Sequence, residues 1–220
     1  MTAITAGLVR YAAVDWIRSQ RWLPPTVIMM IALTVLYTTG GAHTLGGYGA
    51  TAALLFPVTA WLTVGALNAE EPEQRWVTSV QAGGVGVVVG ARVLVASLWA
   101  LLLGLAAVLW PLLIDDPGRR GGDVVIGLAA HAICVGGGAA LGIVLARPLV
   151  DAPGYVALGI GLVFVLELGI RILPPAGPLV VLLTGDDPRN WATLATVAVE
   201  TLLVFGAVAS AGIWATRQRG

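Results

Sequence analysis

Apolar residues along this chain come in long unbroken runs, a pattern that differs from the alternation of a half-buried strand and from the stripe of a soluble amphipathic helix. A helix crosses a bilayer with roughly 17–25 apolar residues. Six runs meet that length: 23–39, 48–67, 93–114, 124–146, 155–173 and 191–215. We therefore predict an all-α integral membrane protein with six transmembrane helices, folded as one domain over residues 1–220.

The stretch before the first run, 7–22, has a different pattern. At about 100° per residue its apolar side chains share one half of a helix, while Arg10, Arg18 and Arg21 fall on the other half. This predicts a cationic amphipathic helix that lies in the membrane interface. The alternative is an ordinary helical tail whose arginines only mark the cytoplasmic side.

The segment between the fifth and sixth runs also holds apolar residues. The stretch PLVVLLTG begins at Pro178 and is far too short to cross a bilayer. It is bounded by Pro174-Pro175 on one side and by Gly185 to Pro188 on the other. We predict a short element before the last helix that is either re-entrant or lies on the external surface.

Composition agrees with the membrane prediction, because 58% of the residues are hydrophobic and only 11% are charged, against roughly 25% charged in soluble domains. The formal net charge is zero, which gives no field to attract nucleic acid. All basic residues are arginine, a usage typical of a high-GC bacterial genome. The single cysteine, Cys134, lies in an apolar run and is expected to be a small buried residue.

Arginine placement predicts the orientation in a bacterial cell membrane, since cytoplasmic segments carry the excess of positive charge. With the N-terminus inside, the cytoplasmic arginines are Arg10, Arg18, Arg21, Arg75, Arg92, Arg147, Arg217 and Arg219. The external ones are Arg119, Arg120 and Arg189. Both termini are therefore predicted to be cytoplasmic.

The longest cytoplasmic segment lies between the second and third runs. Its charged residues surround Pro72, namely Glu70, Glu71, Glu73 and Arg75. Residues 73–81 are predicted to form a short helix with Trp76, Val77 and Val80 on one side. Such a helix offers a docking surface to a cytosolic partner. A solvated loop with self-paired charges is the alternative.

Three charged residues fall inside the last two runs. Glu167 and Arg171 are four residues apart and would share a helix face. Glu200 lies at nearly the same depth in the sixth run, counted at about 1.5 Å per residue. We predict a charge cluster between these helices, and a place in the substrate path or its gate is one interpretation of it. The alternative is a purely structural Glu167–Arg171 pair, with Glu200 protonated.

Catalytic and cofactor sites are not indicated. The glycines at 83–90 match no nucleotide-binding motif, and a chain without lysine lacks the Walker-type phosphate lysine. The runs hold one histidine, His131, and no aspartate, so a protease within the membrane is not expected. For His131 the pattern favours a hydrogen bond between helices. We predict a protein that is not an enzyme and has neither cofactor nor metal.

The order of these elements resembles the membrane subunit of type-2 ATP-binding-cassette (ABC) exporters. The resemblance covers nearly the whole chain and rests on this architecture and on the segment EEPEQRW, residues 70–76, leading into GVVVGARVL, residues 86–94. It implies a permease that works as a homodimer or heterodimer with a cytosolic ATPase. The segment after the second span would be a coupling helix, with the ATPase-facing residues Glu70, Glu71, Glu73, Arg75 and Trp76.

The resemblance further implies a substrate path lined mainly by the second and fifth spans. The short loop between the fourth and fifth spans offers little besides Arg147 and Asp151 for a second contact with the ATPase. The apolar spans favour an amphiphilic or hydrophobic cargo, which is exported with ATP hydrolysed by the partner. A membrane-embedded accessory or sensor subunit without its own transport path is the alternative.

Overall fold

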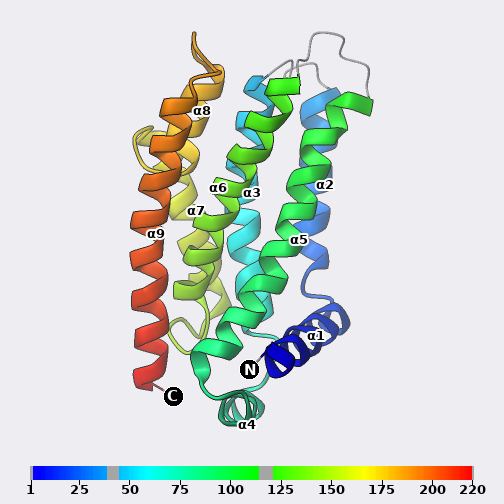
Figure 1. Ribbon diagram of the computed structural model, residues 1–220, viewed down its shortest axis with the longest axis vertical. Coiled ribbons are helices and arrows are strands. Elements are labelled where there is room, and N and C mark those ends of the chain that lie inside the picture. Colours follow the sequence, from blue (N-terminus) through cyan, green and yellow to red (C-terminus); the bar gives the residue numbers. More distant parts are fainter. Residues whose placement is uncertain (1, 39–44, 114–120, 220) are drawn as a thin grey trace.

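The computed structural model describes residues 2–38, 45–113 and 121–219, and the regular structure in these ranges is helical throughout. The helices are α1 (Thr2–Ser19), α2 (Leu23–Thr38), α3 (Leu45–Leu67), α4 (Pro72–Ala82), α5 (Val85–Leu113), α6 (Gly121–Leu145), α7 (Pro153–Gly169), α8 (Ala176–Thr184) and α9 (Trp191–Arg219). Figure 1 shows a bundle of long helices with α1 and α4 lying across one end, where α9 also finishes. We call this the α1–α4 end.

Four of these helices are long and apolar enough to cross a membrane, namely α3, α5 and the greater parts of α6 and α9. A fifth crossing is added if Ala6–Ser19 and Leu23–Thr38 count as one span, despite the bend of 74° between them. Helix α7, with 17 residues, is shorter. The described part of the chain thus bears out an all-helical protein with four or five possible spans. The predicted span ends at 39 and 114 lie outside it.

Helices α3 and α6 approach each other closely because glycine replaces larger side chains at their contact. A Cβ atom at Gly142 would lie 2.5 Å from Cβ of Thr63, and one at Gly138 would collide with the carbonyl oxygen of Phe56. Gly138 and Gly142 form a G-x-x-x-G pair, which lets two helix backbones touch in a membrane. Helix α3 is therefore held at the centre of the bundle.

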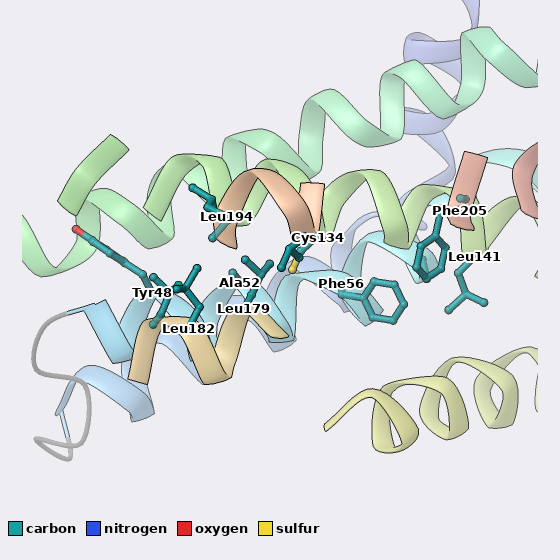
Figure 2. Packing of buried hydrophobic residues seen from close by; sticks show 14 of the residues in the cluster. Tyr48, Ala52, Phe56, Cys134, Leu141, Leu179, Leu182, Leu194 and Phe205 are labelled. Atoms are coloured by element: carbon teal, nitrogen blue, oxygen red, sulfur yellow. The ribbon is translucent and has the colours of Figure 1, made fainter. Parts of the chain in front are cut away.

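The larger hydrophobic cluster joins α3 to α6, α8 and α9 (Figure 2). At one end of it Tyr48 of α3 lies near Leu182 of α8, and at the other the rings of Phe56 and Phe205 meet edge to face with centroids 5.9 Å apart. Cys134 is fully buried between them, as its apolar context predicted. Helices far apart in the sequence thus share one core.

The bend between α1 and α2 is packed against α5 by tryptophan. Trp99 of α5 lies 4.9 Å from Trp22 and 6.2 Å from Trp16, measured between ring centroids, and its Nε1 donates to Oγ1 of Thr26 over 3.0 Å. The helix predicted over 7–22 is thus present as α1, separate from the helix that follows. Arg10 and Arg18 are exposed, as predicted, and the interfacial location of α1 stays a prediction.

The fifth span, predicted as one helix over 155–173, ends earlier than predicted, and a separate helix, α8, follows it. Helix α7 ends at Gly169 because Pro174-Pro175 follows and cannot continue a helix. Helix α8 then packs on α3 through Leu179 (Figure 2), and Leu183 is buried as well. The short apolar element predicted before the last span is therefore a buried helix, and a position on the external surface is wrong.

Contacts with glycine show the direction of α8. A Cβ atom at Gly137, in the middle of α6, would lie 2.9 Å from Cγ of Pro175, and one at Gly46 would lie 3.5 Å from Cγ2 of Thr184. Helix α8 therefore starts at mid-bundle and ends beside the first turn of α3, which is the end opposite α1 and α4 (Figure 1). Helices α7 and α8 together extend from one end of the bundle to the other.

Candidate functional site

Helix α4 begins and ends on clear local signals. Pro72 occupies its first turn, where the missing amide donor costs nothing, and Glu73 complements the positive end of the helix dipole. Gly83 ends the helix in the left-handed conformation, with φ of 85°, and its N–H group donates to carbonyl groups of the last turn. The short helix predicted over 73–81 is therefore confirmed.

The orientation of α4 is the reverse of what burial of apolar surface would give. Trp76 and Val80 are each 64% exposed and Val77 is 47% exposed, whereas Ser79 is buried and Arg75 is half-buried. Figure 1 places α4 at the extreme α1–α4 end, beyond the last turns of the long helices. An exposed apolar patch of this kind marks a surface that binds something else.

Arg92 of α5 connects three elements beneath α4. Its Nη1 and Nη2 each lie 3.1 Å from Oδ2 of Asp15 in α1, and Nη2 also donates to Oε2 of Glu70 over 3.0 Å. The Arg92 residue is only 2% exposed and Glu70 only 5%, so this ion pair is shielded from water. A charge pair in that position holds its geometry only while both partners stay in place.

The second oxygen of Glu70 is also occupied. Oε1 accepts hydrogen bonds from the hydroxyl groups of Tyr11, at 3.1 Å, and Thr78, at 2.6 Å. Tyr11 in turn accepts a bond of 2.8 Å from Nε2 of Gln74. Because Tyr11 belongs to α1 and Thr78 to α4, the carboxylate joins α1, α4 and, through Arg92, α5. We call the set Tyr11, Asp15, Glu70, Thr78 and Arg92 the charged network.

The C-terminal end of α3 is capped by arginine from three different elements. Carbonyl groups in the last turn of a helix lack partners within it, and cations are favoured there by the helix dipole. Here each carbonyl oxygen accepts a hydrogen bond from a different arginine. The carbonyl of Ala66 accepts from Arg92 at 2.8 Å, that of Leu67 from Arg75, and that of Asn68 from Arg21. The end of α3 is therefore fixed at once to the turn between α1 and α2, to α4 and to α5.

Arg75 also reaches the end of α6. Its Nη1 donates to the carbonyl oxygen of Arg147 over 2.9 Å, while the backbone N–H of Arg147 donates to Oδ1 of Asn68 over 3.0 Å. Burial, followed by the nearby charge of Arg92, lowers the pKa of the Arg75 guanidinium. The pattern of donors makes Arg75 a structural tie between α4 and α6.

The five residues predicted to face an ATPase therefore divide into two sets. Glu71, Glu73 and Trp76 are exposed, so they are available to a partner. Glu70 is buried against Arg92, and the guanidinium of Arg75 points inward to the ends of α3 and α6. Glu70 and the head group of Arg75 satisfy buried groups of the chain itself, and contact of these two residues with an ATPase stays a prediction.

The predicted cluster of Glu167, Arg171 and Glu200 is not assembled. Helix α7 ends at Gly169, so Arg171 leaves the face that it would share with Glu167, and its side chain is exposed in the following turn. Glu200 is exposed on α9. Within the described ranges no ion pair joins any two of them.

Glu167 has a different partner. It is 2% exposed, and its Oε2 accepts a bond of 3.2 Å from the backbone N–H of Ala176, the first residue of α8. Acidic side chains are favoured at helix N-termini, where N–H groups lack partners. Glu167 therefore joins the end of α7 to the start of α8, and its role in a substrate path stays a prediction.

Two other polar contacts hold the bundle. His131 Nδ1 donates to the carbonyl oxygen of Gly127 over 2.7 Å, and Nε2 lies 3.1 Å from Oγ1 of Thr51, so the expected hydrogen bond between helices is present. Near the end opposite α1 and α4, Arg189 binds Asp123 through both carboxylate oxygens, at 2.7 and 3.1 Å. That carboxylate raises the pKa of Arg189.

A cavity of about 600 Å³ lies between the start of α2 and helices α3 and α7. Its wall includes Trp61 and Val64 of α3 and Val156 and Ile160 of α7. Polar residues lie at its α1–α4 end: Arg21, Asn68, Arg147 and Asp151. Its volume is within the roughly 300–1,000 Å³ usual for small-molecule sites.

Comparison of the chain with protein-family models, with curated proteins and with solved structures gave no match. The fold and the contacts above are therefore the basis for any functional assignment. No group of metal-ligating side chains occurs among the residues described.

Several residues of this site were missed by sequence reasoning, among them Tyr11, Asp15, Asn68 and Thr78. Asp15 is the only acidic residue before Glu70, and at 100° per residue it lies on the same side of α1 as the buried Ala12 and Trp16. A lone acid on a buried face predicts a buried cation as partner. Asn68, which holds two arginines at the end of α3, has no such signal, since asparagine is common where helices end.

Proposed function

We propose that this chain is the permease subunit of an ABC transporter and exports an amphiphilic or hydrophobic substrate with ATP hydrolysed by a separate subunit. In this proposal it is a six-span protein of a bacterial cell membrane. The α1–α4 end is cytoplasmic, and α1 lies in the membrane interface. A second permease subunit, identical or related, completes the transporter.

One observation carries the proposal: α4 turns Trp76, Val77 and Val80 away from the protein at one extreme end of the bundle. A short helix whose polar side is bound to its own chain leaves its apolar side for a partner. Tryptophan at the centre of such a patch is the residue type most often found at the energetic centre of an interface. Glu71 and Glu73 beside it supply charge for orientation.

The charged network supports this function because it gives α4 a rigid connection to the long helices. A push on α4 would act through Glu70 and Arg92 on α5, and through Arg75 on α3 and α6. A transporter needs such a connection to convert ATP-driven closure of the ATPase into movement of its spans. An accessory or sensor subunit would need a docking surface but no cavity between α3 and α7.

The proposal is tested by co-expressing the chain with an ABC ATPase encoded next to its gene. Intact chain should capture the ATPase on purification and change its turnover. Trp76→Ser combined with Val80→Ser should reduce capture at least tenfold, because two exposed apolar side chains of the patch are lost. The thermal stability of the permease should not change, since neither residue is part of the core clusters.

Trp214→Ser is the matched control, because Trp214 on α9 is as exposed as Trp76, at 64%. It should capture the ATPase like the intact chain. Equal loss of capture in the control and in the α4 variant, or no capture by the intact chain, would contradict the proposal. Capture without any transport by the complex would favour the accessory or sensor subunit.

A further inference from the structure

The cavity between α2, α3 and α7 has two kinds of surface. Apolar groups from Pro24, Trp61, Val64, Val156 and Ile160 form its wall. Trp61 lies in α3, seven residues before Asn68, which directly follows the helix at the rim of the cavity. At about 1.5 Å per residue the wall therefore extends about 10 Å from the rim. The wall is therefore long enough to take up part of an alkyl chain.

The rim at the α1–α4 end is basic. Asn68 brings two arginines to it, since its carbonyl oxygen accepts a bond from Arg21 and its Oδ1 accepts the backbone N–H of Arg147 at 3.0 Å. Asp151 is the one acid among the residues that line the cavity. Two guanidinium groups against one carboxylate leave a net positive rim.

These guanidinium groups are available to a ligand. Arg147 uses only its backbone in the contacts above, and within the described residues its guanidinium binds no other side chain. Arg21 uses one nitrogen, Nη1, for the end of α3. Both side chains are exposed, so their remaining N–H groups can bind an anion.

We propose that this cavity binds an anionic amphiphile, with a phosphate-like or carboxylate head group between Arg21 and Arg147 and its alkyl chain against Trp61 and Ile160. The inference rests on the proposed function only in taking the ligand as cargo. A neutral or cationic head group gains nothing from a rim with this charge, and a free inorganic anion leaves the apolar wall in contact with water.

Radiolabelled dodecyl phosphate is a suitable probe, with the full-length chain in nanodiscs of phosphatidylcholine and empty nanodiscs as the blank. Protein-dependent binding should be displaced by unlabelled dodecyl phosphate. It should resist the same concentrations of inorganic phosphate and of dodecyltrimethylammonium. Displacement by inorganic phosphate would show that the wall takes no part, and displacement by the cationic detergent would overturn the role of the rim.

Arg21→Gln combined with Arg147→Gln should weaken binding at least tenfold, because both charge-assisted contacts are removed. The matched control, Arg10→Gln with Arg18→Gln, removes the same charge from exposed positions of α1 outside the cavity and should bind like the intact chain. Equal affinity of these two double variants would refute the proposal.

Asp151→Asn distinguishes loss of the rim charge from misfolding of a variant. It removes the one opposing charge at the rim and should tighten binding several-fold, which damage to the fold does not produce. Unchanged or weaker binding in this variant would count against the basic rim. Since the measurement needs neither ATP nor ATPase, its failure leaves capture of the ATPase by α4 untouched, and failure of that capture leaves the binding site standing.

Discussion

Replacing Arg92 by methionine should destabilise the protein more than any change on the exposed side of α4. Methionine keeps much of the length of the side chain but removes the hydrogen bonds to Asp15, Glu70 and the carbonyl oxygen of Ala66. Asp15 can regain water, because its side chain is 29% exposed. Glu70 cannot, since its side chain is 1% exposed, so its charge would stay buried without a cation.

The size of the effect follows from that difference. Removing one partner of a buried ion pair typically costs about 3–5 kcal/mol, because the other charge is left uncompensated. Adding Glu70→Gln removes the charge, while the amide oxygen still accepts from Tyr11 and Thr78. The double variant then loses mainly ordinary hydrogen bonds, at about 1 kcal/mol each. It should therefore recover about 2 kcal/mol relative to Arg92→Met alone.

Equilibrium unfolding in mixed micelles of dodecyl maltoside and dodecyl sulfate, followed by circular dichroism, measures these free energies. Asp15→Asn is the comparison within the same network and should cost about 1 kcal/mol or less, because that carboxylate is partly hydrated. Equal stability of Arg92→Met and of the double variant would refute the reasoning. So would a larger loss from Asp15→Asn than from Arg92→Met.

Three further predictions concern the bundle. Gly142→Ala should lower the free energy of unfolding by about 1–3 kcal/mol, because the added Cβ has no room against α3. Gly136→Ala, where the added Cβ meets open space, should leave it unchanged. Unfolding in mixed micelles compares the two variants. Glu167→Leu should free the start of α8 and raise maleimide labelling of a cysteine placed at Leu179 in a Cys134→Ala background, while Glu167→Gln should label like the parent. Asp123→Asn should lower stability by at most about 1 kcal/mol, with less effect at high salt, because the Arg189 side chain is 46% exposed.

The sequence identified the long helices and the short helix after the second of them, because both follow from local signals. Runs of apolar residues define spans, and Pro72 with Gly83 defines α4. It did not identify the break at Gly169, although Pro174-Pro175 was the signal for it. The apolar run from 155 to 173 continued past the break and concealed it, since hydropathy measures solubility and not backbone continuity.

Which face of α4 points outward could not be predicted from the helix alone. Its neighbours decide it: the ends of α3 and α6 offer carbonyl groups and Arg92 offers a cation, so polar residues of α4 turn inward. Glu70 and Glu71 are adjacent in sequence and carry the same side chain, yet one is buried and the other exposed. Their difference depends on Asp15, Tyr11 and Arg92, which are 22 to 59 residues away.

The inverted orientation of α4 also gives a reason for the charged network, although burying its charges carries a desolvation penalty. An apolar contact between α4 and the bundle would hold the helix equally well, but it would bury Trp76 and Val80 and leave no surface for a partner. Hydrogen bonds and ion pairs fix a helix in one direction while its apolar side stays free. A buried network at this end is therefore the arrangement expected if α4 must both bind a partner and transmit its movement to α5.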